Sequence, residues 1–185
     1  MATTILRPNG LTSNLESSIS NAGVITTNGQ AVDGENITLL SDSNASTGII
    51  YGEANGVIAF ELENFIVDLG QPEENFNITD VTVQCDLVEG EKTNLTLRGS
   101  TNPEATSLAG IDSVDVIGTT SNITFSSLGA LTQTQVNNLR LSLASSAAEH
   151  TISEVRVIVT HGPLPAGLIT LNEGLIRLSG KITMN

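Results

Sequence analysis

The sequence has little of several residue types on which large classes of proteins depend. Its 185 residues include one cysteine, no tryptophan, one tyrosine and four phenylalanines. A single cysteine, Cys85, excludes an intrachain disulfide and a thiolate metal cluster. Stability must therefore come from packing or from association with other chains. The scarcity of aromatic rings also removes the platforms on which sugar-binding modules usually stack pyranose rings.

Positive charge is scarce as well. Seven Lys and Arg residues stand against 20 Asp and Glu residues, which gives a net charge of −13 and a pI near 4.2. Such a chain repels phosphate backbones, so we expect neither nucleic acid nor a membrane as a partner. No apolar run approaches the roughly 20 residues of a membrane span. The start, MATTILRPNG, has neither the basic nor the apolar region of a secretion signal, so we expect a chain made without one.

Hydroxyl and amide side chains are abundant instead, with 22 Thr, 18 Ser and 17 Asn. Short segments alternate apolar and polar residues and are separated by Gly, Asn, Asp and Pro, which predicts an all-β, antiparallel β-sandwich of about eight strands; the jelly-roll form of this sandwich is implied only by the family resemblance given below. The clearest strands have predicted inward faces at Val81, Val83, Cys85 and Leu87; at Leu95 and Leu97; at Leu139, Leu141 and Leu143; and at Val155, Val157 and Val159. Further candidate strands are Ile37–Leu40, Val57–Leu62, Phe65–Leu69, Val114–Ile117 and Ile123–Phe125.

One segment, 131–139, has a helical signal. Thr132 and Gln135 have the spacing of a capping box, which predicts a single helical turn that leads into the strand around Leu141.

Three regions are predicted along the chain. Residues 1–35 have weak periodicity and are expected to form an extended N-terminal arm with a short strand or two. Residues 36–162 form the sandwich, and two prolines and two glycines within 162–167 mark its end. Residues 163–185 form a C-terminal β-hairpin, which either folds back on its own sandwich or adds to the sheet of a neighbouring subunit.

The familiar catalytic motifs are missing, so we predict that the chain is not an enzyme and assign no catalytic or cofactor-binding residues. His150 and His161 flank the last predicted strand, about 36 Å apart at ~3.3 Å per residue, and cannot share a metal ion. Cys85 is expected to be a buried, inert thiol. The close carboxylate pairs are interpreted as solvated charges, and they are Glu61/Glu63, Glu73/Glu74, Glu89/Glu91 and Asp112/Asp115.

Two kinds of surface site were weighed and not adopted. The loop 41–47 contains Asp42 and other oxygen ligands that calcium could use, but it has no second carboxylate. Five Asn-x-Ser/Thr sequences suggest glycosylation, although composition alone predicts nearly as many. They begin at Asn36, Asn44, Asn77, Asn94 and Asn122.

Several short segments carry a family resemblance. They are 4–10 (TILRPNG), 40–47 (LSDSNAST), 78–83 (ITDVTV), 131–141 (LTQTQVNNLRL) and 153–160 (SEVRVIVT). In this order they resemble the jelly-roll structural proteins of tailed bacteriophages, over roughly residues 1–162. The chain is also distantly similar to discoidin-like galactose-binding folds, in which an aspartate-bearing loop holds calcium.

The phage resemblance implies a non-catalytic virion protein. The expected role is a capsid decoration (cement) protein, assembled in the host cytoplasm, that binds the outer capsid surface and stabilises the shell. Its partners would be the major capsid protein or other virion proteins and further copies of itself, with a trimer favoured. The alternative is a glycan-binding β-sandwich module on a phage head fibre or tail, in which short polar side chains replace the aromatic platform.

Overall fold

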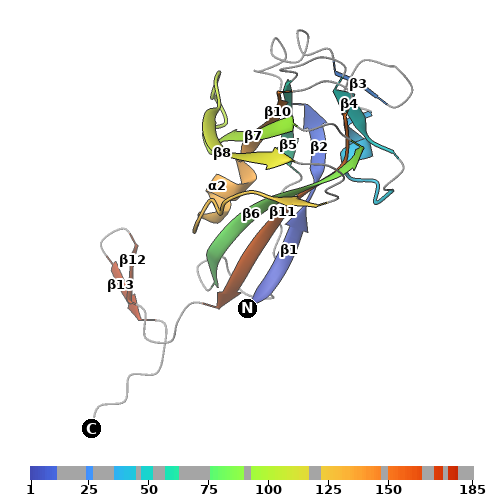
Figure 1. Cartoon of the computed structure of the whole chain (residues 1–185). Coiled ribbons are helices and arrows are strands. Elements are labelled where there is room, and N and C mark those ends of the chain that lie inside the picture. Colours follow the sequence, from blue (N-terminus) through green and yellow to red (C-terminus); the bar gives the residue numbers. More distant parts are fainter. Residues whose placement is uncertain are drawn as a thin grey trace.

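A computed structural model gives the arrangement of most of the chain. It describes residues 1–11, 24–26, 36–44, 47–51, 57–62, 76–89, 93–116, 122–146, 150–163, 169–172 and 175–178. Almost all of the regular structure in these segments is antiparallel β, and it forms two facing sheets and one separate hairpin (Figure 1).

The larger sheet, sheet A, has six strands. Its path is β3-β4-β11-β6-β9, and β1 pairs with β11 outside that path. The bounds are β1 (Ala2–Leu6), β3 (Val24–Thr26), β4 (Ile49–Tyr51), β6 (Phe76–Glu89), β9 (Ile123–Thr124) and β11 (His150–Pro163). One edge of β11 is shared by two strands, because β4 pairs with residues 150–152 and β1 pairs with residues 157–161.

Sheet B has five strands in the order β2-β5-β10-β7-β8. The bounds are β2 (Pro8–Leu11), β5 (Val57–Leu62), β7 (Thr93–Ser100), β8 (Ala109–Val116) and β10 (Arg140–Ser145). Several connections cross between the sheets: β6 in sheet A leads to β7 in sheet B, β8 leads back to β9, and β10 leads to β11. Two antiparallel sheets joined in this way form a sandwich with jelly-roll-like connections, so the predicted fold class is confirmed.

The alternating strands bury the residues that their sequences predict to face inward. The buried face of β6 is formed by Val81, Val83, Cys85 and Leu87, and that of β11 includes Val155, Val157 and Val159. On sheet B the buried residues include Leu95, Leu97, Leu141 and Leu143. These side chains meet between the sheets and form one core. Cys85 is fully buried, and burial raises the pKa of its thiol to about 12, so it is an unreactive core residue.

The short helix is also confirmed. Helix α2 spans Gln133–Asn137, Thr132 is its N-cap, and the reciprocal hydrogen bonds of a capping box are formed. Gln135 donates its backbone N–H to Thr132 Oγ1 at 3.1 Å, and its side-chain oxygen accepts the Thr132 N–H at 2.9 Å. Val136 is buried, which fixes the helix against the core.

The predicted strand at Ile37–Leu40 is wrong. Asn36–Leu40 is a 3₁₀ helix, η2, and the N–H of Ser41 donates to the carbonyl of Thr38 at 2.9 Å. Ile37 and Leu40 are 0% and 1% exposed. Residues three apart lie on the same side of a 3₁₀ helix, so this spacing buries both of them in a way that a strand does not. The other candidate at Phe65–Leu69 lies outside the described residues.

The first residues belong to the two sheets. β1 joins sheet A and β2 joins sheet B, so the chain passes from one sheet to the other at Arg7. Arg7 is ion-paired with Glu154 of β11 at 2.9 Å, and Glu154 is 5% exposed. A second pair on sheet A joins Arg156 to Asp86 at 2.6 Å, and Asp86 also accepts from Asn122.

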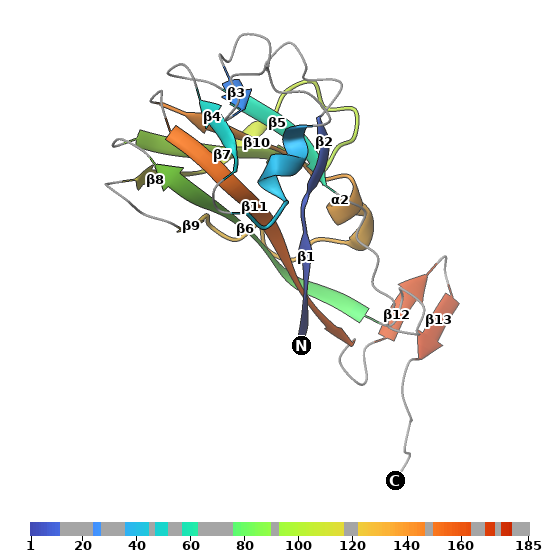
Figure 2. The same cartoon turned by 90° about the vertical axis from the view of Figure 1, so that its right-hand side faces the viewer.

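Strands β1, β6 and β11 continue beyond the rest of the sandwich as a three-stranded ribbon, with the N-terminus at its tip (Figures 1 and 2). The hairpin of β12 (Ile169–Asn172) and β13 (Leu175–Leu178) forms a two-stranded sheet of its own, hydrogen-bonded to neither sheet A nor sheet B. Among the described residues, no helix is long and apolar enough to cross a membrane.

Candidate functional site

A pocket of about 320 Å³ lies between the end of β7, the start of β8 and the approach to α2. Its lining consists of Gly99, Ser100, Thr101, Ile111, Leu128, Leu131 and Leu139. Four of these seven residues are aliphatic, while the hydroxyls of Ser100 and Thr101 supply polar atoms. The volume lies at the lower end of the range of small-molecule sites, which is ~300–1,000 Å³.

The loop 125–131 forms one wall of this pocket and is tied to sheet A through its backbone. The N–H of Phe125 donates to the carbonyl of Val83 at 3.0 Å, and the N–H of Leu128 donates to the carbonyl of Val81 at 2.8 Å. Phe125 is 2% exposed and anchors the loop in the core. The loop therefore continues the edge of β6 beyond β9 and holds Leu128 beside the pocket.

Two carboxylates, one from each sheet, hold the same loop. Asp112 on β8 accepts the N–H of Ser126 at 2.7 Å, and Asp80 on β6 accepts the hydroxyl of Ser127. These hydrogen bonds stabilise the charged forms, so both pKa values lie below the ordinary value of 3.8. For Asp112 the main cause is the N–H of Ser126, and for Asp80 it is the hydroxyl of Ser127.

A glycine turn completes the loop. Gly129 has φ +76°, a left-handed conformation that suits glycine, and its N–H donates to Ser127 Oγ at 2.8 Å. The loop is thus fixed by its own turn and by both sheets, and the pocket is preformed.

Gly99 controls the shape of the pocket floor. A Cβ atom added to Gly99 would lie 2.7 Å from Ile111 Cδ1 and 2.9 Å from Leu141 Cδ2. The backbone carbonyl oxygen of Arg140 lies 3.3 Å from the same position, so an alanine here displaces Ile111 and Leu141 and also crowds the backbone at the start of β10. A Cβ added to Gly110, which lies just before Ile111 on β8, meets nothing within 4 Å.

The outer face of sheet B has a polar network toward the start of β7 and the end of β8. Asn94 donates from Nδ2 to Asp115 Oδ1 at 2.9 Å, and Thr96 bonds both Asn94 Oδ1 at 3.2 Å and the hydroxyl of Ser113 at 2.8 Å. The four side chains lie on adjacent strands and hold one another in place. The Asn94 amide, at one of the Asn-x-Ser/Thr sequences, is engaged in this network.

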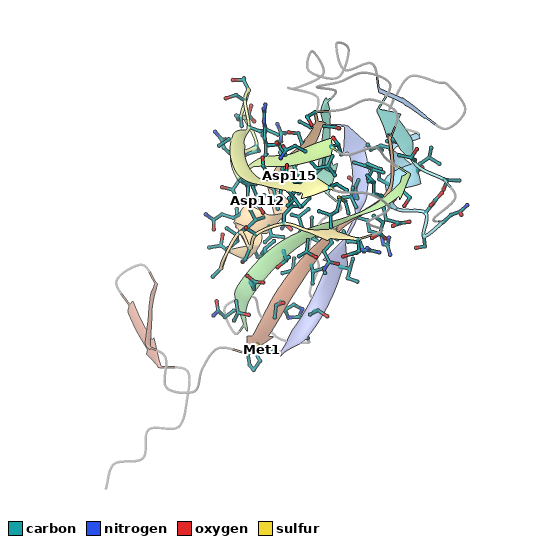
Figure 3. The ribbon with its side chains drawn as sticks, in the orientation of Figure 1. Met1, Asp112 and Asp115 are labelled. Atoms are coloured by element: carbon teal, nitrogen blue, oxygen red, sulfur yellow. The ribbon has the colours of Figure 1, made fainter. Side chains whose placement is uncertain are left out.

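Asp112 and Asp115, one of the carboxylate pairs noted in the sequence, do not converge. Both lie on β8 (Figure 3), but residues three apart on a strand point to opposite faces. The two carboxylates accordingly bind different partners, Ser126 and Asn94. In the other pairs, Glu63, Glu73, Glu74 and Glu91 lie outside the described residues. Within the described part of the chain, no three His, Cys, Asp or Glu residues form a group that could hold a metal ion.

The loop that begins at Ser41 uses its carboxylate internally. Asp42 accepts the N–H of Asn44 at 2.9 Å and the hydroxyl of Thr47 at 2.5 Å, one on each oxygen. Ser43 sits between them with φ 59°. Both Asp42 oxygens therefore stabilise the turn.

The two histidines lie at opposite ends of β11, as the sequence predicts. His161 is 3% exposed, and its Nε2 lies 3.0 Å from Thr4 Oγ1 on β1. It takes part in holding β1 to the ribbon.

The pocket itself was missed by the sequence analysis. It combines Gly99 with Leu128 and Leu131, which come together only through the pairing of the strands and the course of the loop. A usable signal was present, because Leu128 and Leu131 are apolar residues in a segment of Ser, Gly and Thr that has no strand periodicity.

Comparisons with known proteins give distant structural likenesses only. No family model matches the chain, and no curated protein matches it in sequence. The solved structure titled "CpGH89CBM32-6 produced by Clostridium perfringens" is similar with a TM-score of 0.45 and 14% identity, over 75% of this chain and 92% of that one. "CBM32 of AlyQ in complex with 4,5-unsaturated mannuronic acid" has a TM-score of 0.41 and 18% identity, over 72% and 92%. "Truncated AlyQ with CBM32 and alginate lyase domains" has a TM-score of 0.42 and 14% identity, over 92% of this chain and 36% of that chain.

Proposed function

We propose that the chain is a non-catalytic binding module that recognises a neutral glycan in the pocket between β7, β8 and the loop 125–131. The observation that carries this proposal is the composition of the pocket, a preformed aliphatic surface with hydroxyl groups beside it. Such a surface matches a pyranose ring, whose C–H face packs on Ile111 and Leu131 while its hydroxyls bond Ser100 and Thr101. Aliphatic side chains would thus replace the aromatic platform that this sequence lacks.

The same lining supports binding over catalysis. None of the seven lining residues is a carboxylate, a histidine, a lysine or a cysteine, so the pocket wall contains no group suited to general acid–base chemistry. Cleavage of a glycosidic bond usually needs two carboxylates that flank the bond. Asp112, the nearest carboxylate along the chain to Ile111, has its charge committed to the N–H of Ser126.

Charge and size define the expected ligand further. The net charge of −13 repels polyanions, which favours neutral over acidic sugars. At ~0.3 kcal/mol per non-hydrogen atom, a single pyranose of about 12 such atoms binds with a Kd on the order of millimolar. Several copies acting together would then be needed for tight attachment.

The test is calorimetric titration of the wild-type chain and two glycine variants with neutral and uronic oligosaccharides. Gly99→Ala should weaken binding by tenfold or more, because the displaced Ile111 enters the pocket. Gly110→Ala should bind like the wild type, since its new Cβ meets open space. The proposal is wrong if no glycan binds the wild type, or if Gly99→Ala binds as well as Gly110→Ala.

A chelator provides a second comparison. Because both oxygens of Asp42 already accept hydrogen bonds within the loop, glycan binding should be unchanged in EDTA. A calcium-dependent site, by contrast, would lose its glycan when the calcium is chelated. Loss of binding in EDTA would therefore indicate that the glycan binds at a loop and not in the pocket. Reducing-end analysis of the same oligosaccharides after prolonged incubation should show no cleavage.

The capsid decoration role is kept as a second candidate, because the hairpin β12–β13 is a feature suited to assembly with other chains. A decoration protein would bind purified phage capsids through protein contacts and would do so in the presence of competing sugars. Capsid binding that survives Gly99→Ala, together with no glycan binding, would favour this role over the glycan-binding one.

A further inference from the structure

The C-terminal hairpin has one aliphatic face. In the β12–β13 register Ile169 is opposite Leu178, and Leu171 is opposite Ile176. Cross-strand partners share a face of the ladder, so these four residues lie together on one side of the hairpin. A two-stranded hairpin alone is marginal in water. Within the described residues this hairpin forms no ladder with either sheet of its own sandwich.

The charges of the two parts of the chain are opposite. Residues 163–185 contain Arg177 and Lys181 against Glu173, a net charge of +1. Residues 1–162 contain the other five basic and 19 acidic residues, a net charge of −14. Two sandwiches of this protein repel each other, whereas the hairpin segment of one copy is attracted to the sandwich of another.

Strand β1 offers a free edge to receive a strand. Within the described residues it pairs with β11 on one side only, so every second residue turns its backbone groups toward the open side. Residues Ala2, Thr3 and Ile5 are exposed, and Ile5 is 47% exposed. The sequence 2–6 has none of the charges or prolines that commonly protect an edge strand from pairing.

The hairpin is connected to the sandwich close to the point where this edge begins. β11 ends at Pro163. Two residues before this end, His161 is paired with Ala2, the first residue of β1. Five residues separate Pro163 from Ile169, a connection that spans at most ~20 Å at 3.3–3.6 Å per residue. A hairpin on so short a connection reaches a neighbour's β1 only where two ribbon tips lie close together.

We propose that the β12–β13 hairpin of one copy adds to the free edge of β1 in a second copy. Each copy then gives one hairpin and receives one, an arrangement that closes into a ring of a few subunits about an axis near the ribbon tips. Main-chain hydrogen bonds along β1 supply the contact, as in other cases of strand addition. This interface is independent of the pocket.

The first test is the mass of the full-length chain in solution, measured by light scattering. The wild type should have a small-integer multiple of 19.3 kDa. Leu171→Asp places a charge on the aliphatic face and should give the monomer. Thr170→Asp adds the same charge one residue away on the other face and should keep the wild-type mass. A monomeric wild type, or an oligomer that withstands Leu171→Asp, would overturn the proposal.

The second test identifies the receiving edge. Two singly substituted chains, Thr3→Cys and Thr170→Cys, are co-expressed and treated with a bis-maleimide of about 10 Å, long enough to cross two strands. A covalent dimer containing both chains should form. Replacing Thr3→Cys by Asn102→Cys, exposed on the loop after β7, should give none. The native Cys85 is fully buried and does not interfere. If Leu171→Asp abolishes the oligomer but Thr3→Cys and Thr170→Cys form no cross-link, the hairpin is needed for assembly and β1 is not the receiving edge.

Discussion

Two edges of sheet A, on either side of the same stretch of β6 and β11, are held in different ways. At one edge, the pocket edge, the loop 125–131 is fixed by backbone bonds to β6 and by carboxylates from both sheets. At the other edge, the β1 edge, β1 is bonded to β11 and, within the described residues, to no further strand. A loop held by backbone bonds can surround a rigid cavity for a small ligand. An edge strand with one unpaired side can instead accept a strand of another chain.

The largest predicted effect is a difference in stability between the two edges. Phe125→Ala removes a buried ring that anchors the loop and should lower the free energy of unfolding by about 3–5 kcal/mol. Ile5→Ala, at the half-exposed position of β1, should lower it by about 0.5 kcal/mol or less. Urea unfolding of both variants, at a concentration where neither associates, measures the difference. Equal losses would mean that the pocket edge is no more tightly built than the β1 edge.

A smaller effect concerns the helix that borders the pocket. Thr132→Ala removes the N-cap hydroxyl of α2 and should cost about 1 kcal/mol. Thr134→Ala, an exposed position inside the same helix, should change stability by less than about 0.5 kcal/mol. The same urea experiment compares the two. If the two substitutions lower the free energy of unfolding equally, the capping box does not stabilise the helix beside the pocket.

The smallest effect is a pH dependence confined to the pocket edge. Asp80 and Asp112 have folded-state pKa values below 3.8, so their contribution to stability is present above that pH and is lost as the pH falls through the folded-state values. The double variant Asp80→Asn, Asp112→Asn should be less stable than the wild type at pH 7, and the gap should close below about pH 3.8. Urea midpoints at several pH values test this. A gap that is constant or widens on acidification would contradict the assigned hydrogen bonds.

Local patterns predicted much of the fold. Alternation along β6 and β11 identified their buried faces, because side chains of a strand alternate between water and the core whatever its partners are. The spacing of Thr132 and Gln135 likewise identified α2, because a capping box is a bond between neighbours in sequence. The strand predicted at Ile37–Leu40 was wrong because the local pattern is ambiguous. A four-residue segment with apolar residues at both ends fits a strand and a 3₁₀ turn alike.

The candidate site was less accessible to sequence reasoning. Gly99 and Leu128 line one pocket although 28 residues separate them, and only the path of the loop back to β6 brings them together. The low aromatic content argued against a sugar site, yet an aliphatic lining cannot be recognised from composition, because leucines in a core and in a pocket are alike in sequence. β1 and β11 are separated by most of the sequence, so local patterns could not predict their pairing either.

The most direct test of the central claim is an NMR titration of the uniformly ¹⁵N-labelled full chain with the neutral oligosaccharide that binds best in calorimetry. The amide signals of Gly99, Ser100 and Leu128 should shift in a saturable way, with one Kd, while those of Thr3 and Ile5 on β1 should stay unchanged. Saturable shifts confined to β1 or to the Asp42 loop, or no shifts with any neutral glycan, would contradict the assignment of the pocket as the binding site.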